Sequence, residues 1–352
     1  AAWWASMPGM RPLLKLSYAW NNSLPFGPAG FHLVNIAIHA ANSVLAFLLL
    51  THLALREGLN ERAARALAWF GALLFALHPV QTEAVTYVSG RSTSLAALFS
   101  LASILAWVEG RARGRTWLLG LSAALFAAGL LVKETSAVVP LALLLWESGN
   151  IQAERKLSSR IPWLHFLVLG LAAAVAVSSP MYRHLFNTSF QARSIGVNLL
   201  TQTDATIYLM GQLVRFDRLN ADPALAVVHV WTATLAMQAA VLLLLLALGA
   251  FFIRRRPAAS FGILWFFLWL APTNSIIPRL DVANDRQLYL AILGPAWIAA
   301  WLLGSRFSVP RGLFPALAIA CALALGLATY QRNRVYANEV GFWRGVSPKR
   351  PR

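Results

Sequence analysis

The sequence predicts an all-α protein, a polytopic membrane helix bundle of about ten spans. Its 352 residues are 58% hydrophobic and only 12% charged, whereas a water-soluble domain carries about 25% charged residues. The mean hydropathy is +0.60, and long apolar runs recur along the whole chain. These observations exclude a soluble enzyme and a disordered chain. They also exclude a nucleic-acid-binding module, because the basic residues are scattered between apolar runs and form no basic face.

The predicted spans are runs of apolar residues, since about 20 such residues in a helix cross the hydrocarbon core. Ten runs are interpreted as spans: 31–54, 66–77, 92–108, 116–132, 135–147, 162–179, 230–253, 260–272, 287–304 and 312–330. Three of them are short, which predicts tilted, broken or partly re-entrant helices. We therefore expect one membrane domain over 31–330, an outer loop over 1–30 and an outward linker over 331–352 that leads toward further repeats.

The placement of arginine predicts the orientation. The net charge is +17, and alternate short connections hold basic clusters such as Arg111/Arg113 and Arg254/Arg255/Arg256. Short basic loops stay cytoplasmic, so the longer connections face outward. We expect an integral, multi-pass protein of the bacterial inner membrane, or of the ER in a eukaryote, with its active face toward the periplasm or lumen.

A polar stripe runs along the first predicted span. His32, Asn35, His39 and Asn42 are spaced by three, four and three residues, which places them on one helical face. Polar groups at membrane depth are costly, so this face is expected to point into the bundle or a wet cavity. Interhelical hydrogen bonding is the favoured interpretation. A shared metal ion is not expected, because His32 and His39 stand about 10 Å apart along the axis.

A second cluster contains His78, Glu83 and Arg91. Pro79 suits the first turn of a helix, and the apolar spacing that follows predicts a short helix on the outer face. A carboxylate beside a cation at the membrane surface can act as a general base or form a simple ion pair. Both interpretations remain open from the spacing.

Two further charged clusters are expected at the outward ends of helices. Lys133 and Glu134 form an adjacent pair that is either functional or a turn in which the two charges neutralise each other. Arg279 and Arg286 stand at the mouth of the next span. Two guanidiniums there suit a lipid phosphate, which Arg binds bidentately, although snorkelling anchors would look the same.

Taken in order, these clusters carry recognisable motifs. They are Gly30-Phe31-His32-Leu33-Val34-Asn35, Leu77-His78-Pro79 with Glu83-Ala84-Val85 and Gly90-Arg91, Lys133-Glu134 with Pro140, Asn274 with Asp285-Arg286-Gln287-Leu288-Tyr289, and Thr329-Tyr330-Gln331-Arg332-Asn333. Their order resembles that of the transmembrane-and-tetratricopeptide-repeat O-mannosyltransferases and their bacterial relatives.

The resemblance implies a GT-C type fold with short outward-facing helices in the loops. It implies an enzyme that transfers mannose or a similar sugar from a polyprenyl- or dolichyl-phosphate carrier to a Ser or Thr hydroxyl of a protein, with inversion. The partners would be this donor, the bilayer and an acceptor protein, with no nucleic acid, and a requirement for a divalent cation stays open. Glu83 and His78 become the catalytic candidates, and the substrate-binding candidates are Arg286, Arg279, Arg91, Lys133, Glu134, Asp285 and Tyr289.

The sequence departs from the family pattern at two places. Family members usually carry an Asp-rich motif in the first outer loop, which supplies the expected base, but residues 1–30 contain no Asp or Glu. We expect that motif upstream of Ala1 or missing. Asp285 stands where Glu is usual. The main alternative is a catalytically silent membrane scaffold that presents outward tetratricopeptide repeats to partner proteins. A transporter is a weaker alternative, because the paired broken helices of an inverted repeat are not evident.

Overall fold

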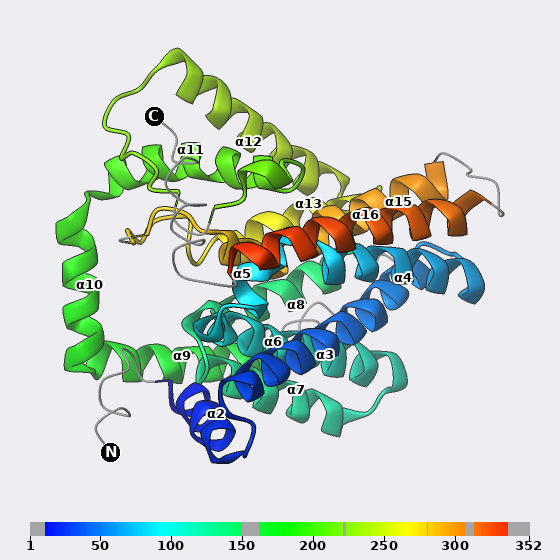
Figure 1. The fold of residues 1–352 in the computed structure, drawn as a ribbon, viewed down its shortest axis with the longest axis horizontal. Helices are drawn as coiled ribbons and strands as arrows, with labels where there is room; N and C mark the ends of the chain where they lie inside the picture. The colour runs from blue at the N-terminus through cyan, green and yellow to red at the C-terminus, as the bar shows by residue number, and fades with distance from the viewer. Residues whose placement is uncertain (1–10, 150–161, 221–222, 280, 307–312, 337–352) are drawn as a thin grey trace.

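The computed structural model describes residues 11–149, 162–220, 223–279, 281–306 and 313–336. All regular elements in these ranges are helices, so the all-α prediction is confirmed for this part of the chain. Figure 1 shows the helices gathered in one bundle, with α10 bridging α9 and α11 at its edge.

The helices differ widely in length. They are α2 (Pro12–Ser23), α3 (Gly27–Arg56), α4 (Glu61–Leu77), α5 (Thr82–Val85), α6 (Arg91–Arg113), α7 (Thr116–Leu130), α8 (Val139–Ser148), α9 (Trp163–Ser178), α10 (Pro180–Ala192), α11 (Ile195–Gln212), α12 (Ala233–Phe252), α13 (Pro257–Leu270), α14 (Leu288–Ala291), α15 (Leu293–Trp301) and α16 (Leu313–Val335). Single tight turns include η1 (Pro79–Gln81), η2 (Val88–Gly90), η3 (Glu134–Val138) and η6 (Asp285–Gln287).

The predicted apolar runs coincide with these helices, but their lengths do not establish ten crossings. Among the described residues, four helices are long and apolar enough to cross a membrane, or up to seven if each of three bent pairs is one span. Helices α7 and α13 are apolar but have only 15 and 14 residues. The chain is an integral membrane protein, and the count of about ten spans stays a prediction.

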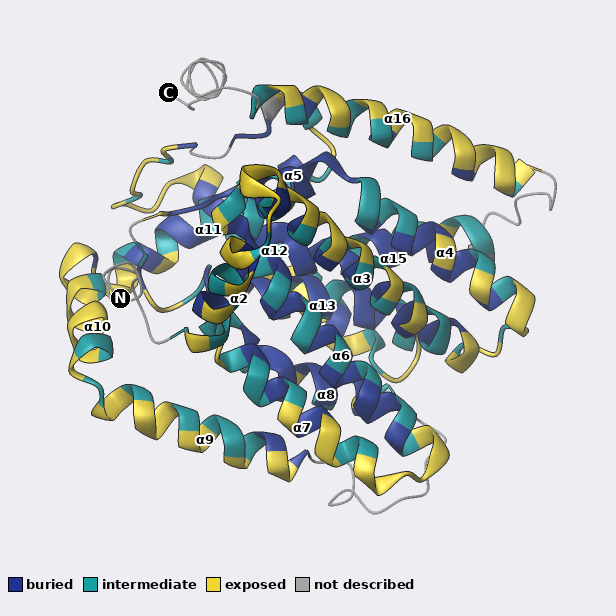
Figure 2. Cartoon of the chain, turned by 60° about the horizontal axis from the view of Figure 1, so that its bottom comes forward, coloured by how far each residue is buried: buried dark blue, intermediate teal, exposed yellow. Residues whose placement is uncertain are grey.

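Burial separates the centre of the bundle from its outer faces (Figure 2). Trp146, Trp265 and Trp297 are among the largest fully buried side chains of the core. In contrast, α12 and α16 expose large apolar side chains such as Leu243 and Leu323. An apolar side chain gains nothing by facing water, so these outer faces suit contact with lipid.

Two glycines set the crossing of α13 and α15. A Cβ added at Gly262 would lie 2.9 Å from the carbonyl oxygen of Gly294, and one at Gly294 would meet the backbone of Gly262. Small residues of this kind let membrane helices approach backbone to backbone. Their contact fixes the ends of the connection over residues 271–287, which carries two of the predicted arginines.

The segment after α4 corrects one prediction. Residues 79–90 form no amphipathic helix on the outer face. They break into η1, α5 and η2, and η1 with α5 turns by 50° from α4. Val80 and Ala84 are buried, and Gly90 packs so closely on the carbonyls of Glu83 and Ala84 that no Cβ fits. The segment therefore folds into the bundle and takes Glu83 with it.

The stretch predicted as an outer loop over 1–30 contains helical structure where it is described. Helix α2 occupies Pro12–Ser23, and α3 begins at Gly27. The Tyr18 hydroxyl on α2 donates to the carbonyl of Val88, 2.8 Å away. Helix α2 is thereby tied to η2 and lies beside the site described next.

Candidate functional site

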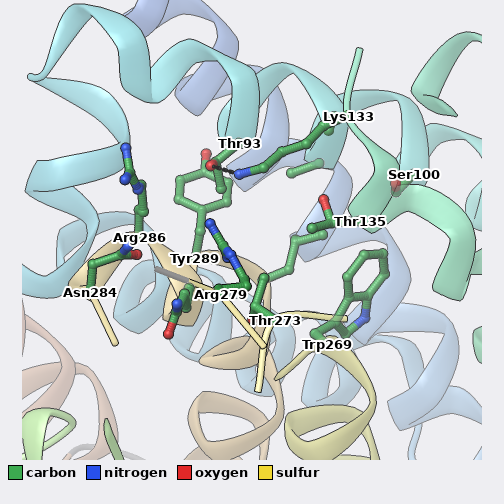
Figure 3. A pocket seen from close by; sticks show the side chains of 14 residues that line it. Thr93, Ser100, Lys133, Thr135, Trp269, Thr273, Arg279, Asn284, Arg286 and Tyr289 are labelled. Carbon is green, nitrogen blue, oxygen red and sulfur yellow. Dashed lines mark hydrogen bonds between the residues drawn. The ribbon is translucent and has the colours of Figure 1, made fainter. Parts of the chain in front are cut away.

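A polar cavity of about 40 Å³ lies between the start of α6, the end of α7 and the connection from α13 to α14 (Figure 3). Its wall includes three cationic side chains from two distant parts of the sequence: Lys133, Arg279 and Arg286. Neutral side chains complete the wall, among them Thr93, Ser100, Thr135, Trp269, Thr273, Asn284 and Tyr289. None of its described lining residues is acidic.

Lys133 reaches the cavity because α7 ends just before it. Its backbone is extended, with φ −158°, and its N–H returns to the carbonyl of Gly129. The ammonium nitrogen donates to the Thr93 hydroxyl, 2.7 Å away, as drawn in Figure 3. Burial lowers the pKa of Lys133 to about 7, and the charges of Arg279 and Arg286 act in the same direction. A substantial fraction of this amine is therefore neutral near pH 7.

The side chain of Glu134 points away from that of Lys133 and has different partners. Its carboxylate accepts two hydrogen bonds from Arg11, at 2.7 and 3.2 Å, and a third from the Tyr182 hydroxyl at 2.9 Å. Burial alone would raise the pKa of Glu134, but the bonds and charge of Arg11 bring it below its usual value. Glu134 therefore joins the start of α2 to the start of α10 and stands outside the cavity wall.

Arg286 forms a hydrogen bond and an ion pair with the buried carboxylate of Glu83. Its backbone N–H donates to one oxygen of that carboxylate at 2.9 Å, and its Nε lies 3.5 Å from the other. A terminal nitrogen also lies 3.5 Å from Asp281, which is largely exposed. The guanidinium is thus positioned by carboxylates while part of it remains open to the cavity.

Arg279 contributes the third cation. Its carbonyl accepts a hydrogen bond from Arg193, which anchors the backbone. Burial and the nearby charge of Arg286 lower the pKa of its guanidinium, although arginine stays charged at physiological pH. Its side chain extends into the cavity toward Lys133 (Figure 3). Within the described ranges this guanidinium makes no hydrogen bond, so its donors are available to an anion.

The two catalytic candidates lie away from the cavity wall. Glu83 is only 5% exposed, and both its oxygens face Arg286. The Nδ1 of His78 accepts from the N–H of Val80, and its Nε2 lies 3.0 Å from the carbonyl of Leu213. Since that carbonyl can only accept, the proton is on Nε2 and the ring is neutral. Neither side chain has a free basic atom directed into the cavity.

Arg91 was predicted to bind substrate, but it lies in the interior of the helix bundle. It is fully buried and does not line the cavity. It donates to Asn35 at 2.7 Å, to Asn21 at 2.5 Å and to the carbonyl of Ser17 at 3.2 Å, and it lies over the Tyr18 ring. The guanidinium therefore ties together α2, α3 and α6.

Three of the four stripe residues make the expected interhelical hydrogen bonds. The Nε2 of His39 donates to a backbone carbonyl on α4, which leaves Nδ1 to accept from the Tyr289 hydroxyl at 2.7 Å. Asn42 donates to the same hydroxyl at 2.9 Å, and Asn35 accepts from the buried arginine of α6. His32 makes no such bond within the described residues and is exposed on the first turns of α3, where α2 is the neighbouring helix.

Asp285 serves the fold around the site. Its side chain is 2% exposed and accepts from Arg332 near the end of α16, 3.3 Å away. This ion pair joins η6 to α16 and so supports the turn that carries Arg286. Thr93, Thr273 and Asn284 were not predicted as lining residues, because Thr and Asn near helix ends are common for capping and carry no distinctive spacing.

A larger groove of about 670 Å³ adjoins the cavity, and Arg286 lines both. Its walls include the aromatic side chains of Tyr18, Phe31 and Tyr87 together with Val88. The site thus combines a cationic cavity with a mostly apolar approach. Among the described residues, no three His, Cys, Asp or Glu side chains lie together where they could hold a metal ion.

Comparison with known proteins bears on this arrangement. Residues 18–179 match the family described as dolichyl-phosphate-mannose-protein mannosyltransferase. The chain is 38% identical to protein O-mannosyl-transferase TMTC4 of Homo sapiens over 144 residues, which is 37% of this chain and 19% of that protein. It is 35% identical to protein O-mannosyl-transferase Tmtc2 of Drosophila melanogaster over 164 residues, which is 41% of this chain and 16% of that protein. Over these segments the chain is similar to the protein O-mannosyltransferases.

This relationship confirms the resemblance predicted from the motifs. The family match includes Glu83, Arg91 and Lys133 but ends before Arg279 and Arg286. The matched segment spans about a fifth or less of the curated relatives' own length. No solved structure matches the chain significantly.

Proposed function

We propose that this chain is the membrane portion of a GT-C type protein O-mannosyltransferase. It would transfer mannose or a similar sugar from a polyprenyl- or dolichyl-phosphate carrier to a Ser or Thr hydroxyl of a protein, with inversion. The observation that carries this proposal is the convergence of Lys133, Arg279 and Arg286 on one cavity. The names of the relatives supply the sugar and the acceptor class.

The cations suit the charge that develops in such a reaction. As the bond from the sugar C1 to the phosphate oxygen breaks, that oxygen keeps the electron pair. Preorganised cations in a site shielded from water stabilise this charge more than they would in bulk water. Arg279 and Arg286 would bind the phosphate oxygens, and Glu83 would act as a positioning residue that holds Arg286. The mostly apolar groove beside Arg286 would receive the isoprenoid part of the donor.

The acceptor hydroxyl must lose its proton as it attacks C1 from the face opposite the phosphate. Inversion follows from such a single displacement. Glu83 and His78 would not act as the general base that removes the hydroxyl proton, because their acceptor atoms are already engaged by protein groups. The Asp-rich motif that the family resemblance implies for the first outer loop is the candidate for that role, and residues 1–30 of this sequence contain no Asp or Glu.

The direction of the helices supports an outward-facing site. Helix α6 begins near Thr93 at the cavity and ends at Arg111 and Arg113, and α13 begins beside Arg256 and ends near the cavity. The cavity and the short basic connections therefore lie at opposite ends of the same helices. With the basic connections in the cytoplasm, the cavity would open toward the periplasm or the ER lumen.

The test is sugar transfer by the complete protein, purified in detergent, from dolichyl-phosphate mannose and from a bacterial polyprenyl-phosphate sugar to an acceptor protein. Arg279→Ala should raise the donor KM by roughly 10- to 100-fold, since a charge-assisted hydrogen bond contributes about 1.5–3 kcal/mol. The matched control is Arg65→Ala, which removes an exposed arginine paired with Glu61. Absence of transfer by the wild-type protein, or equal KM values for Arg279→Ala and wild type, would refute the proposal.

The alternative function is a silent scaffold that presents outward tetratricopeptide repeats to partner proteins. The absence of any acidic side chain among the described lining residues favours it. A scaffold would retain its partners in Arg279→Ala and would transfer no sugar in either form.

A further inference from the structure

The cavity has more positive charge than its own wall can balance. Lys133, Arg279 and Arg286 all line it, whereas none of the described lining residues is acidic. The nearest carboxylates are already committed, Glu83 to Arg286 and Glu134 to Arg11. Three like charges in a shielded space repel one another strongly. Loss of a proton from one of these groups therefore relieves the repulsion.

Lys133 is the cation that can do so. Arginine remains protonated in proteins, whereas a shielded lysine releases its proton readily. From α6, Thr93 contacts the amine as a neutral partner. The charged groups around it are Arg11 before α2, Glu83 on α5, Glu134 on η3, and Arg279 and Arg286 in the connection from α13. Burial and the three arginines outweigh the attraction of Glu134 and lower the pKa of Lys133 to about 7.

The proposed reaction changes the charge of the ligand by one unit. The donor phosphate is a diester with a single negative charge. The leaving lipid phosphate is a monoester whose second pKa is about 6, so it carries close to two negative charges at pH 7.5. The acceptor O–H bond breaks, a bond from that oxygen to C1 forms, the bond from C1 to the phosphate oxygen breaks, and one proton is released.

We propose that Lys133 takes up one proton as the monoester forms, so that its amine is neutral while the donor is bound and becomes an ammonium beside the leaving lipid phosphate. The proton of the acceptor hydroxyl leaves through the base on the opposite face of the sugar, and Lys133 takes an equivalent proton from solution. This inference rests on the proposed function. Arg279 and Arg286, less the negative charge of Glu83 that pairs with Arg286, leave one net positive charge for the single negative charge of the donor. A further positive charge would arise at Lys133 only as the second negative charge develops. The total charge of the cavity then stays constant through the reaction, and the arrangement favours the product-like charge over that of the donor, as catalysis requires.

Calorimetry tests this without turnover. Polyprenyl monophosphate and its methyl diester are titrated into the complete protein at pH 7.5 in two buffers of different ionisation enthalpy, which gives the number of protons bound. A lysine with a pKa of about 7 is mostly neutral at that pH. The monoester should therefore cause an uptake of roughly 0.7 proton, and the diester less than half of that.

Two variants assign the uptake to Lys133. Lys133→Arg keeps a permanent charge, so it should bind the monoester with no proton uptake. Arg65→Lys, which exchanges one cation for another at an exposed position paired with Glu61, should keep the wild-type uptake. If Lys133→Arg does not fold, the wild-type protein still decides. Above pH 7 its monoester affinity should fall by close to tenfold per pH unit, while the diester affinity changes much less.

The outcomes separate this inference from the proposed function. Equal uptake for monoester and diester, or undiminished uptake in Lys133→Arg, would overturn the role of Lys133 even if sugar transfer is observed. Uptake specific to the monoester without any sugar transfer would support Lys133 as the proton site and refute the transferase. If neither lipid binds, both are refuted.

Discussion

The contact between Glu83 and Arg286 gives a prediction that distinguishes a positioning residue from a catalytic base. Replacing Glu83 by Gln keeps the size of the side chain and removes its charge. One amide oxygen can still accept the 2.9 Å bond from the backbone of Arg286, but the amide NH₂ would face the guanidinium at the site of the 3.5 Å ion pair. The buried carboxylate would be lost while its partner keeps its charge.

The magnitude follows from the burial of this pair. Glu83 is 5% exposed, so its interaction is not screened as a surface ion pair would be. A hydrogen bond to a charged group contributes about 1.5–3 kcal/mol, and removal of one partner of a buried pair costs about 3–5 kcal/mol. We expect Glu83→Gln to lower the free energy of unfolding by about 1–3 kcal/mol, and Glu83→Ala by about 3–5 kcal/mol.

The assay combines unfolding in detergent with transfer kinetics. A positioning role predicts that Glu83→Gln raises the donor KM, and that its effect is not additive with that of Arg286→Lys in a double-mutant cycle. The matched control is Glu61→Gln, which alters an exposed pair on α4 and should change stability by a few tenths of a kcal/mol at most. If Glu83→Gln abolishes kcat with an unchanged donor KM and unchanged stability, Glu83 is the base and this reasoning is wrong.

Three further predictions follow from other buried groups. Arg91→Lys should destabilise the protein by about 2–4 kcal/mol, because one ammonium cannot replace a buried guanidinium with several partners. The donor KM of the folded fraction should not change, and a large rise would place Arg91 in the binding site. Tyr289→Phe should cost about 1–3 kcal/mol by removing a hydroxyl that joins α3 to α14. Tyr330→Phe, at an exposed position on α16, is its control, and equal thermal stabilities of the two variants would contradict the hydrogen-bond geometry. The pKa of Lys133 is lowered from 10.5 to about 7, so in that pH window the unfolded chain binds more protons and the free energy of unfolding rises with pH. Thermal unfolding at pH values across this window should show the rise in wild type and a weaker one in Lys133→Met, and an identical rise would refute the shift.

The charged pair at the end of α7 shows where prediction from sequence reaches its limit. Lys133 and Glu134 are adjacent, and the sequence left a functional pair and a mutual neutralisation open. In the folded protein one side chain points to Thr93 and the other to Arg11 and Tyr182. Lys133 has extended backbone just before η3 begins at Glu134, so the two side chains leave the chain in different directions and the charges could separate. Which partners they met depended on helices distant in the sequence.

Arg91 and Arg286 make the same point. Both were predicted to bind substrate. In a sequence, an arginine that supports the fold cannot be told from one that binds a ligand, because both have polar neighbours such as Glu, Asn or Tyr. Only the tertiary contacts separate Arg91, fully buried against Asn35 and Asn21, from Arg286, which lines the cavity. No periodicity within one segment carries that distinction.

The sequence by itself determined that this is an integral membrane protein built of helices, because the hydrophobic requirement of the bilayer acts on composition and on runs of residues. It also determined most of the inward stripe on α3, since a helical repeat is a local property, and it carried the motifs that resemble the protein O-mannosyltransferases. The tertiary structure alone decided which cations share a cavity, since Lys133 and Arg279 are separated by almost 150 residues and meet through helix packing. It also decided that Glu83 supports Arg286 instead of facing the cavity, because Gly90 and the break after α4 fold that segment into the bundle.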